Sequence, residues 1–363
     1  MKKIFVFVAG FIFVSLGIEA FLKLSRITPP TLKYYNKTYG SLNRANIDYF
    51  KSVEGLYIGS TNYDGRFRES YPKRKSDKKT LRIMLMGDSF VEGIDVFSHN
   101  HFAQYLENLL SKRLNRKVEV LNFGRGNCLL APSSYYFTSY VSHEYDADIV
   151  LYFTEYRDIF YPSTTMSYPS TYYSFDSNKK LVPFFSWQST PEYKLHTKLI
   201  SNPILKHYES SAYFRLLYRA MARVKISGLS YLTFGKFSGE KAPEQSYATS
   251  SASEEPLSDV TKKIYDSLAS YPGGQTIFVV RDKPMPAPCI KKYFAEKAYE
   301  NIHLSDTFND FYIKNTNINA YYFKASAAYG GHWNNQGHEA VGYFLTNRLA
   351  RDLEKYKMPN YER

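Results

Sequence analysis

Short apolar runs alternate with helical patterns along the middle of the chain. The runs at 82–86, 118–123 and 148–154 are mostly apolar and have the length of strands, as expected for strands buried on both faces of a parallel sheet. Helical patterns with one apolar face lie between them, at 101–115 and at about 133–144. This strand–helix–strand order predicts an α/β domain with helices on both faces of a parallel sheet.

The alternation stops after Phe160. The stretch from 161 to about 200 is rich in Tyr, Ser, Pro and Thr without a regular period, and a helical pattern follows at about 204–224. Residues 241–256 are rich in Ser, Ala and Glu, a composition typical of flexible loops. We therefore predict that residues 161–250 are an insertion, of the kind that often shapes a substrate site at the carboxyl ends of strands.

The α/β pattern then resumes and completes the domain, which we place at 81–358. The predicted elements are a helix at about 257–270, a strand at 276–281, a helix at about 290–299, a strand at 302–304 and a helix at about 336–355.

The N-terminus has a different pattern. Met1-Lys2-Lys3 precedes an apolar run from Ile4 to about Leu24, and about 20 helical residues at 1.5 Å each span a hydrocarbon core of about 30 Å. The two lysines favour an N-terminus in the cytoplasm and the rest of the chain outside it. We predict a membrane-spanning signal anchor at 1–25, followed by a stalk and lead-in segment at 26–80.

A cleaved signal peptide is the alternative for this segment. Ile18-Glu19-Ala20 would be its cleavage site, but the small residue usual three positions before the cut is absent. An uncleaved anchor is therefore favoured.

Composition narrows the class of protein. The chain of 363 residues is 44% hydrophobic and 22% charged, which indicates a globular protein rather than a disordered one. The net charge of +13 is uneven, with 13 Lys and Arg against 5 Asp and Glu between Lys23 and Lys79. A basic segment beside a membrane is attracted to anionic headgroups. No nucleic-acid-binding motif accompanies the charge, so we expect no nucleic-acid partner.

Cysteine and histidine usage gives no sign of a metal. Cys128 and Cys289 are the two cysteines, and no Cys-x-x-Cys or Cys/His cluster occurs. We expect no metal and no cofactor. Two lone thiols are favoured over a disulfide.

The first candidate for chemistry follows the run at 82–86. There the chain reads Gly87-Asp88-Ser89 and continues into a helical pattern. A serine on a strand-to-helix turn has an exposed hydroxyl with backbone N–H groups nearby, which suits a nucleophile. An alcohol also needs a base to take its proton. His332, in a Gly-rich loop before the last helix, is the best candidate, whereas His338 is expected to pack inside that helix.

These segments together resemble the SGNH/GDSL hydrolase family. Gly87-Asp88-Ser89 resembles its first block, which contains the nucleophile, and 122–127 (Asn-Phe-Gly-Arg-Gly-Asn) resembles its second block, which supplies an oxyanion-hole glycine, here Gly126 or Gly124. The segment 332–338 (His-Trp-Asn-Asn-Gln-Gly-His) resembles the last block, whose first histidine is the base and which includes Asn334.

Two further segments resemble membrane-anchored members of the family. Residues 63–68 (Tyr-Asp-Gly-Arg-Phe-Arg) are similar to an element before their first strand, and 16–22 to the end of their anchor helix. The resemblance covers about 60–350 and implies a three-layer, flavodoxin-like α/β fold with a central parallel sheet.

The chain departs from the family pattern at two places. The Asn-Asp pair expected after the third strand is Arg157-Asp158 here. Arg157 could stabilise an oxyanion or form a structural salt bridge. The acid expected two or three residues before His332 is absent, since Tyr329 and Gly330 occupy those positions.

Three hypotheses replace the missing acid. A Ser–His dyad could suffice, with a backbone carbonyl orienting the ring. Glu155, Asp158 or Asp306 could substitute for the acid, or catalysis could be lost. Asp88 and Asp158 are the other expected supporting residues.

The resemblance implies a serine esterase outside the cytoplasm. Ser89 would be the nucleophile and His332 the base, and the substrate would be a small ester, an O-acylated glycan or another cell-envelope ester. The alternatives are an O-acyltransferase of an exopolysaccharide or envelope glycan, and a catalytically impaired binding or scaffold protein. The expected partners are the membrane, through the N-terminal helix, and proteins of the cell envelope.

Overall fold

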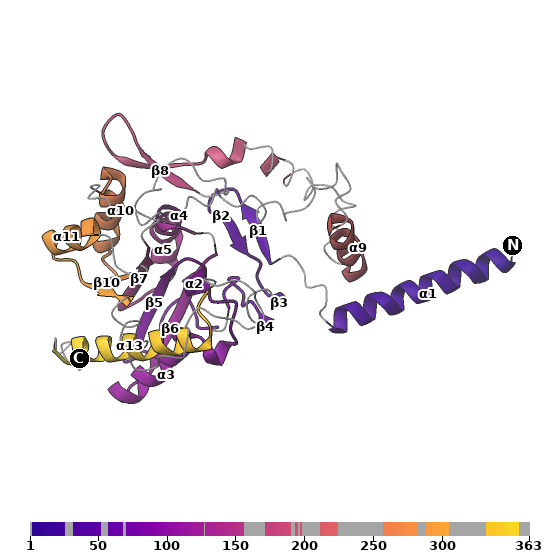
Figure 1. Cartoon of the computed structure of the whole chain (residues 1–363), viewed down its shortest axis with the longest axis horizontal. Helices are drawn as coiled ribbons and strands as arrows, with labels where there is room; N and C mark the ends of the chain where they lie inside the picture. The colour runs from indigo at the N-terminus through magenta and orange to yellow at the C-terminus, as the bar shows by residue number, and fades with distance from the viewer. Residues whose placement is uncertain are drawn as a thin grey trace.

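The structure is a computed structural model of the whole chain (Figure 1). It describes residues 2–25, 32–51, 57–67, 70–126, 128–155, 171–189, 193–194, 197, 211–223, 257–281, 288–304 and 332–355.

Five parallel strands form the centre of the molecule. They are β5 (Leu81–Gly87), β6 (Val118–Gly124), β7 (Ile149–Thr154), β10 (Gln275–Val280) and β11 (Asn301–His303). Their order in the sheet is β11-β10-β7-β5-β6, and every neighbouring pair is parallel. This is the flavodoxin-like order, with a topological switch point between β5 and β7. The predicted α/β class with a central parallel sheet is confirmed.

Helices cover both faces of this sheet (Figure 1). One face packs against α3 (Phe102–Leu114) and α13 (Asn335–Lys355). The other face packs against α4 (Leu130–Tyr136), α10 (Asp259–Ala269) and α11 (Pro288–Glu296). These three layers are held by two apolar clusters, one on each side of the strands.

The alternation of side chains along each strand explains why the runs are continuously apolar. On β5, Ile83 and Leu85 join the cluster beneath α3 and α13, whereas Met84 and Met86 join the cluster beneath α4 and α10. A strand that is buried on both faces in this way requires apolar residues at successive positions.

The predicted helix at 133–144 starts three residues earlier and is not uniform. It consists of α4, a π-helical turn η2 (Phe137–Val141) and the short α5 (Ser142–Glu144). The chain enters η2 without a break, because Phe137 is still helical.

The predicted stalk at 26–80 is folded against the domain over most of its described length. It contains two antiparallel pairs, β1 (Lys33–Asn36) with β2 (Gly40–Asn43), and β3 (Asp48–Lys51) with β4 (Tyr57–Ser60). Tyr57 and Phe67 from this segment form a small apolar cluster with Ile94 of the domain. Four-residue strands are too short to give a clear period, which explains why the pattern of residues did not predict them.

The predicted insertion at 161–250 is described in part. It contains a hairpin of β8 (Tyr172–Phe175) and β9 (Leu181–Phe184), the turn η3 (Ser186–Ser189) and the helix α9 (Ala212–Arg223). Tyr172 and Tyr173 pack into the cluster beneath α4. The loop predicted at 241–256 lies outside the described residues.

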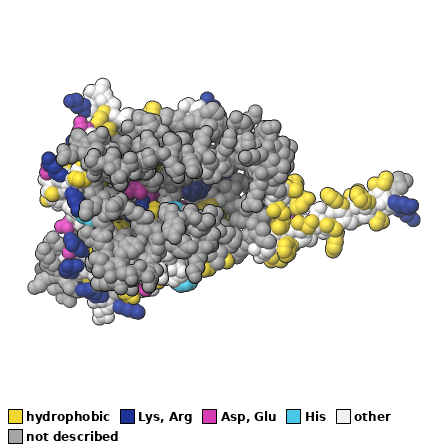
Figure 2. Space-filling view, in the orientation of Figure 1, with side chains coloured by type: hydrophobic (Ala, Val, Ile, Leu, Met, Phe, Trp, Pro, Cys, Tyr) yellow, Lys and Arg dark blue, Asp and Glu magenta, His cyan; other side chains and the backbone are white. Residues whose placement is uncertain are grey.

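The N-terminal helix α1 (Lys2–Ser25) projects from the rest of the molecule (Figure 1). It is long and apolar enough to cross a membrane, a test that a signal sequence also passes. Its apolar side chains are mostly exposed and form the yellow rod in Figure 2. Such a surface is unstable in water and suits a lipid environment.

Candidate active site

The nucleophile turn lies at the carboxyl end of β5, next to the switch point of the sheet. α2 (Ser89–Glu92) begins directly after Asp88, whose Oδ1 accepts a hydrogen bond from the Phe90 N–H at 2.9 Å. A side-chain oxygen that caps the first N–H groups of a helix fixes where the helix begins. Asp88, predicted as a supporting residue, therefore sets the start of α2 and the position of Ser89.

Two glycines allow this turn to be tight. A Cβ on Gly87 would lie 2.6 Å from Val91 Cγ2, and one on Gly124 would lie 2.2 Å from the Glu92 backbone nitrogen. No side chain fits in either space. The α2 backbone therefore packs directly on the ends of β5 and β6.

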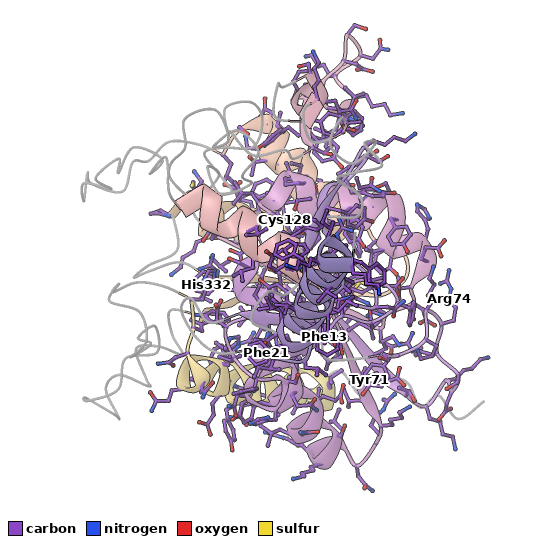
Figure 3. The ribbon with its side chains drawn as sticks, turned by 90° about the vertical axis from the view of Figure 1, so that its right-hand side faces the viewer. Phe13, Phe21, Tyr71, Arg74, Cys128 and His332 are labelled. Atoms are coloured by element: carbon purple, nitrogen blue, oxygen red, sulfur yellow. The ribbon has the colours of Figure 1, made fainter. Side chains whose placement is uncertain are left out.

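The structure brings Ser89 and His332 together. A hydrogen bond of 2.7 Å joins Ser89 Oγ and His332 Nε2, across 243 residues of chain. The next residue, Trp333, is fully buried and has edge-to-face contacts with Phe90 and Phe102. The indole anchors the loop before α13, so that the imidazole lies over the carboxyl edge of the sheet (His332 is labelled in Figure 3).

A third residue, Asp95, faces the other side of the imidazole. Its Oδ2 lies 3.4 Å from His332 Nδ1, and its side chain is buried. Its neighbours Ile94 and Val96 are also buried. The distance is longer than an ideal hydrogen bond, as is common at catalytic sites without substrate. Ser89, His332 and Asp95 thus form a chain of contacts in the order hydroxyl, imidazole and carboxylate.

Gly93 places Asp95 on this side of the site. It ends α2 in the left-handed conformation, with φ of 55°, and its N–H donates to Ser89 O at 2.9 Å. A Cβ there would lie 2.3 Å from His101 Nε2. The chain therefore reverses direction directly after α2. This reversal brings the Asp95 carboxylate to the imidazole of His332, the same ring that Ser89 contacts.

The acids expected from the sequence have other positions. Glu155 forms an ion pair with Arg281, and Arg281 Nη2 also donates to Asp88 Oδ2 at 2.6 Å. Asp158 and Asp306 lie outside the described residues. Asp95 was missed, although one signal pointed to it: a charged residue stands between two apolar residues, six positions after the candidate nucleophile.

Both glycines expected to supply an oxyanion hole have their N–H groups engaged. The Gly124 N–H donates to Asn122 Oδ1 at 2.9 Å, and the Gly126 N–H donates to Glu92 Oε2 at 2.8 Å. Neither N–H is directed at a substrate in this arrangement. Gly124 has instead the packing role described above.

The Ser89 N–H is a better-placed donor. It belongs to the first turn of α2, where backbone N–H groups have no intrahelical acceptor, and no group in the described part of the chain accepts from it. Arg157, expected as another oxyanion group, lies outside the described residues.

Glu92 connects the site to the N-terminal segment. Its buried carboxylate accepts from Asn43 Nδ2 at 2.8 Å and lies 3.8 Å from Lys33 Nζ. Lys33 Nζ also donates to Gly126 O at 3.0 Å. Lys33 of β1 and Asn43 of β2 therefore help to hold the loop after β6, which contains Gly126, beside Ser89. A stalk would not have this role.

The remaining residues of the last block are structural. Asn334 caps α13, because its Oδ1 accepts from the Gly337 N–H at 2.9 Å. His338 is buried, its ring stacks on Phe102, and its Nδ1 accepts from the Phe102 N–H at 3.4 Å. This agrees with its predicted place inside the helix.

Neither a metal-ligand cluster nor a disulfide is present in the part of the chain that the structure describes. There, no group of three His, Cys, Asp or Glu side chains is placed to hold a metal ion. Neither Cys128 nor Cys289 is in a disulfide, and Cys128 Sγ accepts a hydrogen bond from Arg125 Nη2 at 3.0 Å.

Comparisons with known proteins concern the fold. No family model and no curated protein sequence matches the chain. It is similar to the structure of a member of the lipolytic G-D-S-L family from Veillonella parvula DSM 2008, with 11% identity and a TM-score of 0.36 over 75% of this chain and 99% of that one. A putative lipolytic protein of the G-D-S-L family from Desulfitobacterium hafniense DCB-2 is similar at 12% identity and a TM-score of 0.33, over 73% and 98%.

A third similar structure is a two-domain esterase active on acetylated mannans, co-crystallised with mannopentaose. Its identity is 10% and its TM-score 0.37, and the match covers 75% of this chain but only 49% of that protein. The function proposed below rests on the geometry of the site.

Proposed function

We propose that this protein is a membrane-anchored serine esterase whose catalytic residues are Ser89, His332 and Asp95. The observation that carries the proposal is the chain of contacts at the carboxyl edge of the sheet: 2.7 Å from Ser89 Oγ to His332 Nε2 and 3.4 Å from His332 Nδ1 to Asp95 Oδ2. This order of groups is the one that makes a serine hydroxyl nucleophilic.

The reaction has two halves. Ser89 Oγ attacks the ester carbonyl while His332 Nε2 takes its proton, and the leaving alcohol then receives that proton as the C–O bond of the ester breaks. Water attacks the acyl-enzyme in the same way, and the bond between Oγ and the acyl carbon breaks as Oγ regains a proton. Asp95 orients the ring and stabilises the imidazolium in both halves. The Ser89 N–H is the proposed donor to the developing oxyanion.

The substrate we propose is an O-acyl group on a glycan or another ester of the cell envelope. Two lysines before the apolar part of α1 favour a cytoplasmic N-terminus. The segment from residue 32 onward, and the site with it, would then face the outside of the membrane. His332 is about one-quarter exposed, which supports access from solvent.

The test uses the full chain in detergent. The wild type is expected to react with a fluorophosphonate probe and to hydrolyse 4-nitrophenyl acetate. Ser89→Ala should lose the labelling and lower kcat/KM by at least about 10⁴-fold, since the nucleophile is gone. Ser98→Ala, which removes a nearby hydroxyl outside the site, is the matched control and should retain both.

The outcomes separate the alternatives. A wild-type chain that neither reacts with the probe nor hydrolyses the ester contradicts an esterase and favours a binding protein. Labelling at Ser89 with turnover only when a sugar acceptor is added would indicate an acyltransferase, which uses the same acyl-enzyme.

A further inference from the structure

One carboxylate of the anchor helix is bound by a helix far away in the sequence. Glu19 on α1 accepts hydrogen bonds from the first groups of α9: from Ala212 N to Oε1 at 2.9 Å, from Tyr213 N to Oε2 at 2.8 Å, and from Ser211 Oγ to Oε2 at 2.9 Å. Lys23 Nζ lies 3.0 Å from Oε1. Ser211 Oγ also accepts from the Phe214 N–H at 3.2 Å, so Glu19 caps α9 together with Ser211 and joins the two helices.

The joint lies near the domain-proximal end of α1. Glu19 is six residues before Ser25, or about 9 Å along the helix axis at 1.5 Å per residue. Within α1, the positions that are not fully exposed are Ser15, Glu19 and Leu22, which share one helix face. Figure 1 shows α9 beside this end of α1, and the two helices are in contact. The rest of the α1 surface is apolar and uncovered.

α9 itself has two different faces. Ala212 and Arg215 are buried. Phe214, Leu216 and Leu217 are 53%, 38% and 40% exposed. At about 100° per residue, Phe214 and Leu217 lie on the side of the helix opposite to the buried pair, whereas Leu216 lies about 40° from Ala212, on the flank of the buried side. An apolar face on a helix fixed beside a transmembrane helix is placed to contact the same lipid.

We propose that α9 lies in the boundary between headgroups and acyl chains of the membrane that α1 spans, with Phe214 and Leu217 in contact with lipid. The argument for lipid over a protein partner is proximity, because α9 is in contact with α1, and both helices carry exposed apolar side chains. The inference rests on the proposed membrane anchor. It also makes α1 a retained part of the fold, since a cut at Ile18-Glu19-Ala20 would separate the cap from its helix.

The test places a nitroxide label at single cysteines of the full chain, in a Cys128→Ser/Cys289→Ser background. The chain is reconstituted into vesicles of phosphatidylethanolamine with a minority of phosphatidylglycerol. Collision with oxygen, which concentrates in lipid, is compared with collision with a water-soluble nickel chelate. Phe13→Cys on α1 reports the anchor, Phe214→Cys reports α9, and Asn178→Cys, in the turn between β8 and β9, is the aqueous control.

The expected result is an oxygen-to-nickel collision ratio that is severalfold higher at positions 214 and 13 than at position 178. A high ratio at Phe13 with an aqueous ratio at Phe214 overturns the placement of α9 and leaves the anchor intact. Aqueous ratios at both positions overturn the anchor and this inference together. Ester hydrolysis, measured separately, reports only the proposed activity.

The role of Glu19 is tested in the Phe214→Cys protein. Glu19→Ala removes the hydrogen bonds that join α1 to α9, and the ratio at position 214 should fall severalfold toward that of Asn178. Glu19→Gln keeps an oxygen that can accept from the α9 N–H groups and should restore most of the ratio. An unchanged ratio in Glu19→Ala would overturn the joint between the two helices.

Discussion

Buried carboxylates lie at both edges of the central sheet, but the groups that contact them differ. At the amino edge, Arg82 is fully buried, and its guanidinium donates to Glu119 at 2.5 and 3.0 Å and to Asp146 at 2.6 Å. At the carboxyl edge, His332 has a short contact with Ser89 and a longer one, 3.4 Å, with Asp95. Short, multiple hydrogen bonds fix the first group in place. The second group has one short contact and one longer contact, the arrangement on which the proposed proton transfer rests.

The difference teaches that burial alone does not identify a functional acid. Glu119 and Asp95 are both about 2% exposed. Glu119 faces a permanent cation, whose removal would leave its charge poorly compensated, whereas Asp95 faces the imidazole that contacts Ser89. The partner of each carboxylate, rather than its burial, distinguishes the two edges.

The largest effect that would test this comparison is expected from Asp95→Asn. The amide cannot supply the charge that stabilises the imidazolium, so kcat/KM for ester hydrolysis should fall by about 10³–10⁴-fold. Asp259→Asn, at an exposed carboxylate, is the matched control; it should not change the rate and should cost less than about 1 kcal/mol of stability. A loss of less than about tenfold would mean that the Ser–His pair works without an acid, and the contrast between the edges would fail.

Arg82→Met should have the next largest effect, and on stability. It removes the hydrogen bonds of the guanidinium to Glu119 and Asp146 and leaves the buried Glu119 with Lys117 as its cationic partner, which costs about 3–5 kcal/mol of unfolding free energy. Thermal and urea unfolding of the full chain in detergent would measure this loss. Lys262→Met breaks an exposed pair with Asp259 and should cost less than about 1 kcal/mol. Equal losses in the two variants would contradict a structural role for the amino edge.

Glu92→Gln sharpens the comparison, because Glu92 lies at the carboxyl edge but is hydrogen-bonded as firmly as the amino-edge groups. Glutamine has one acceptor oxygen for the two donors, Asn43 Nδ2 and the Gly126 N–H, so about 1–3 kcal/mol of stability should be lost. The change in kcat/KM should be much smaller than in Asp95→Asn. Glu296→Gln, at an exposed side chain, serves as the control; a catalytic loss matching that of Asp95→Asn would assign Glu92 to the chemistry.

The smallest expected effect is a pH dependence at the amino edge. Burial acts to raise the pKa of Glu119, but hydrogen bonds from Lys117 and Arg82 outweigh it and hold the pKa below its ordinary value. A pKa lowered by folding contributes stability above the unfolded value, about 4.3, and this contribution is lost as the pH falls through the folded value. The unfolding free energy of Glu119→Gln should therefore fall less between pH 5 and more acidic pH than that of the wild type. Parallel curves for the two proteins would contradict this assignment.

The sheet and the first two members of the site could be predicted from the sequence. The strands are continuous apolar runs because both of their faces are buried, as Met84 and Leu85 show. Ser89 and His332 each lie in a short motif beside a strand or a helix end, and such local signals can be recognised without knowing the fold.

The parts that could not be predicted depend on contacts between distant segments. Asp95 is an acid of the site only because Gly93 reverses the chain and the loop before α13 places His332 above it. Gly126 resembles an oxyanion glycine, but the Glu92 side chain occupies its N–H. The strands at 33–60 have four residues each, so their order comes from packing on the domain rather than from a local period.

The contact between Ser89 and His332, which joins two distant parts of the chain, has a consequence for the timing of synthesis. Ser89 and Asp95 leave the ribosome early, but their partner His332 follows 243 residues after Ser89, about 12–50 s later at about 5–20 residues per second. Until then the nascent chain has Ser89 and Asp95 without the imidazole that contacts both of them. A chain released by the ribosome before this point would, on the proposed function, have no esterase activity.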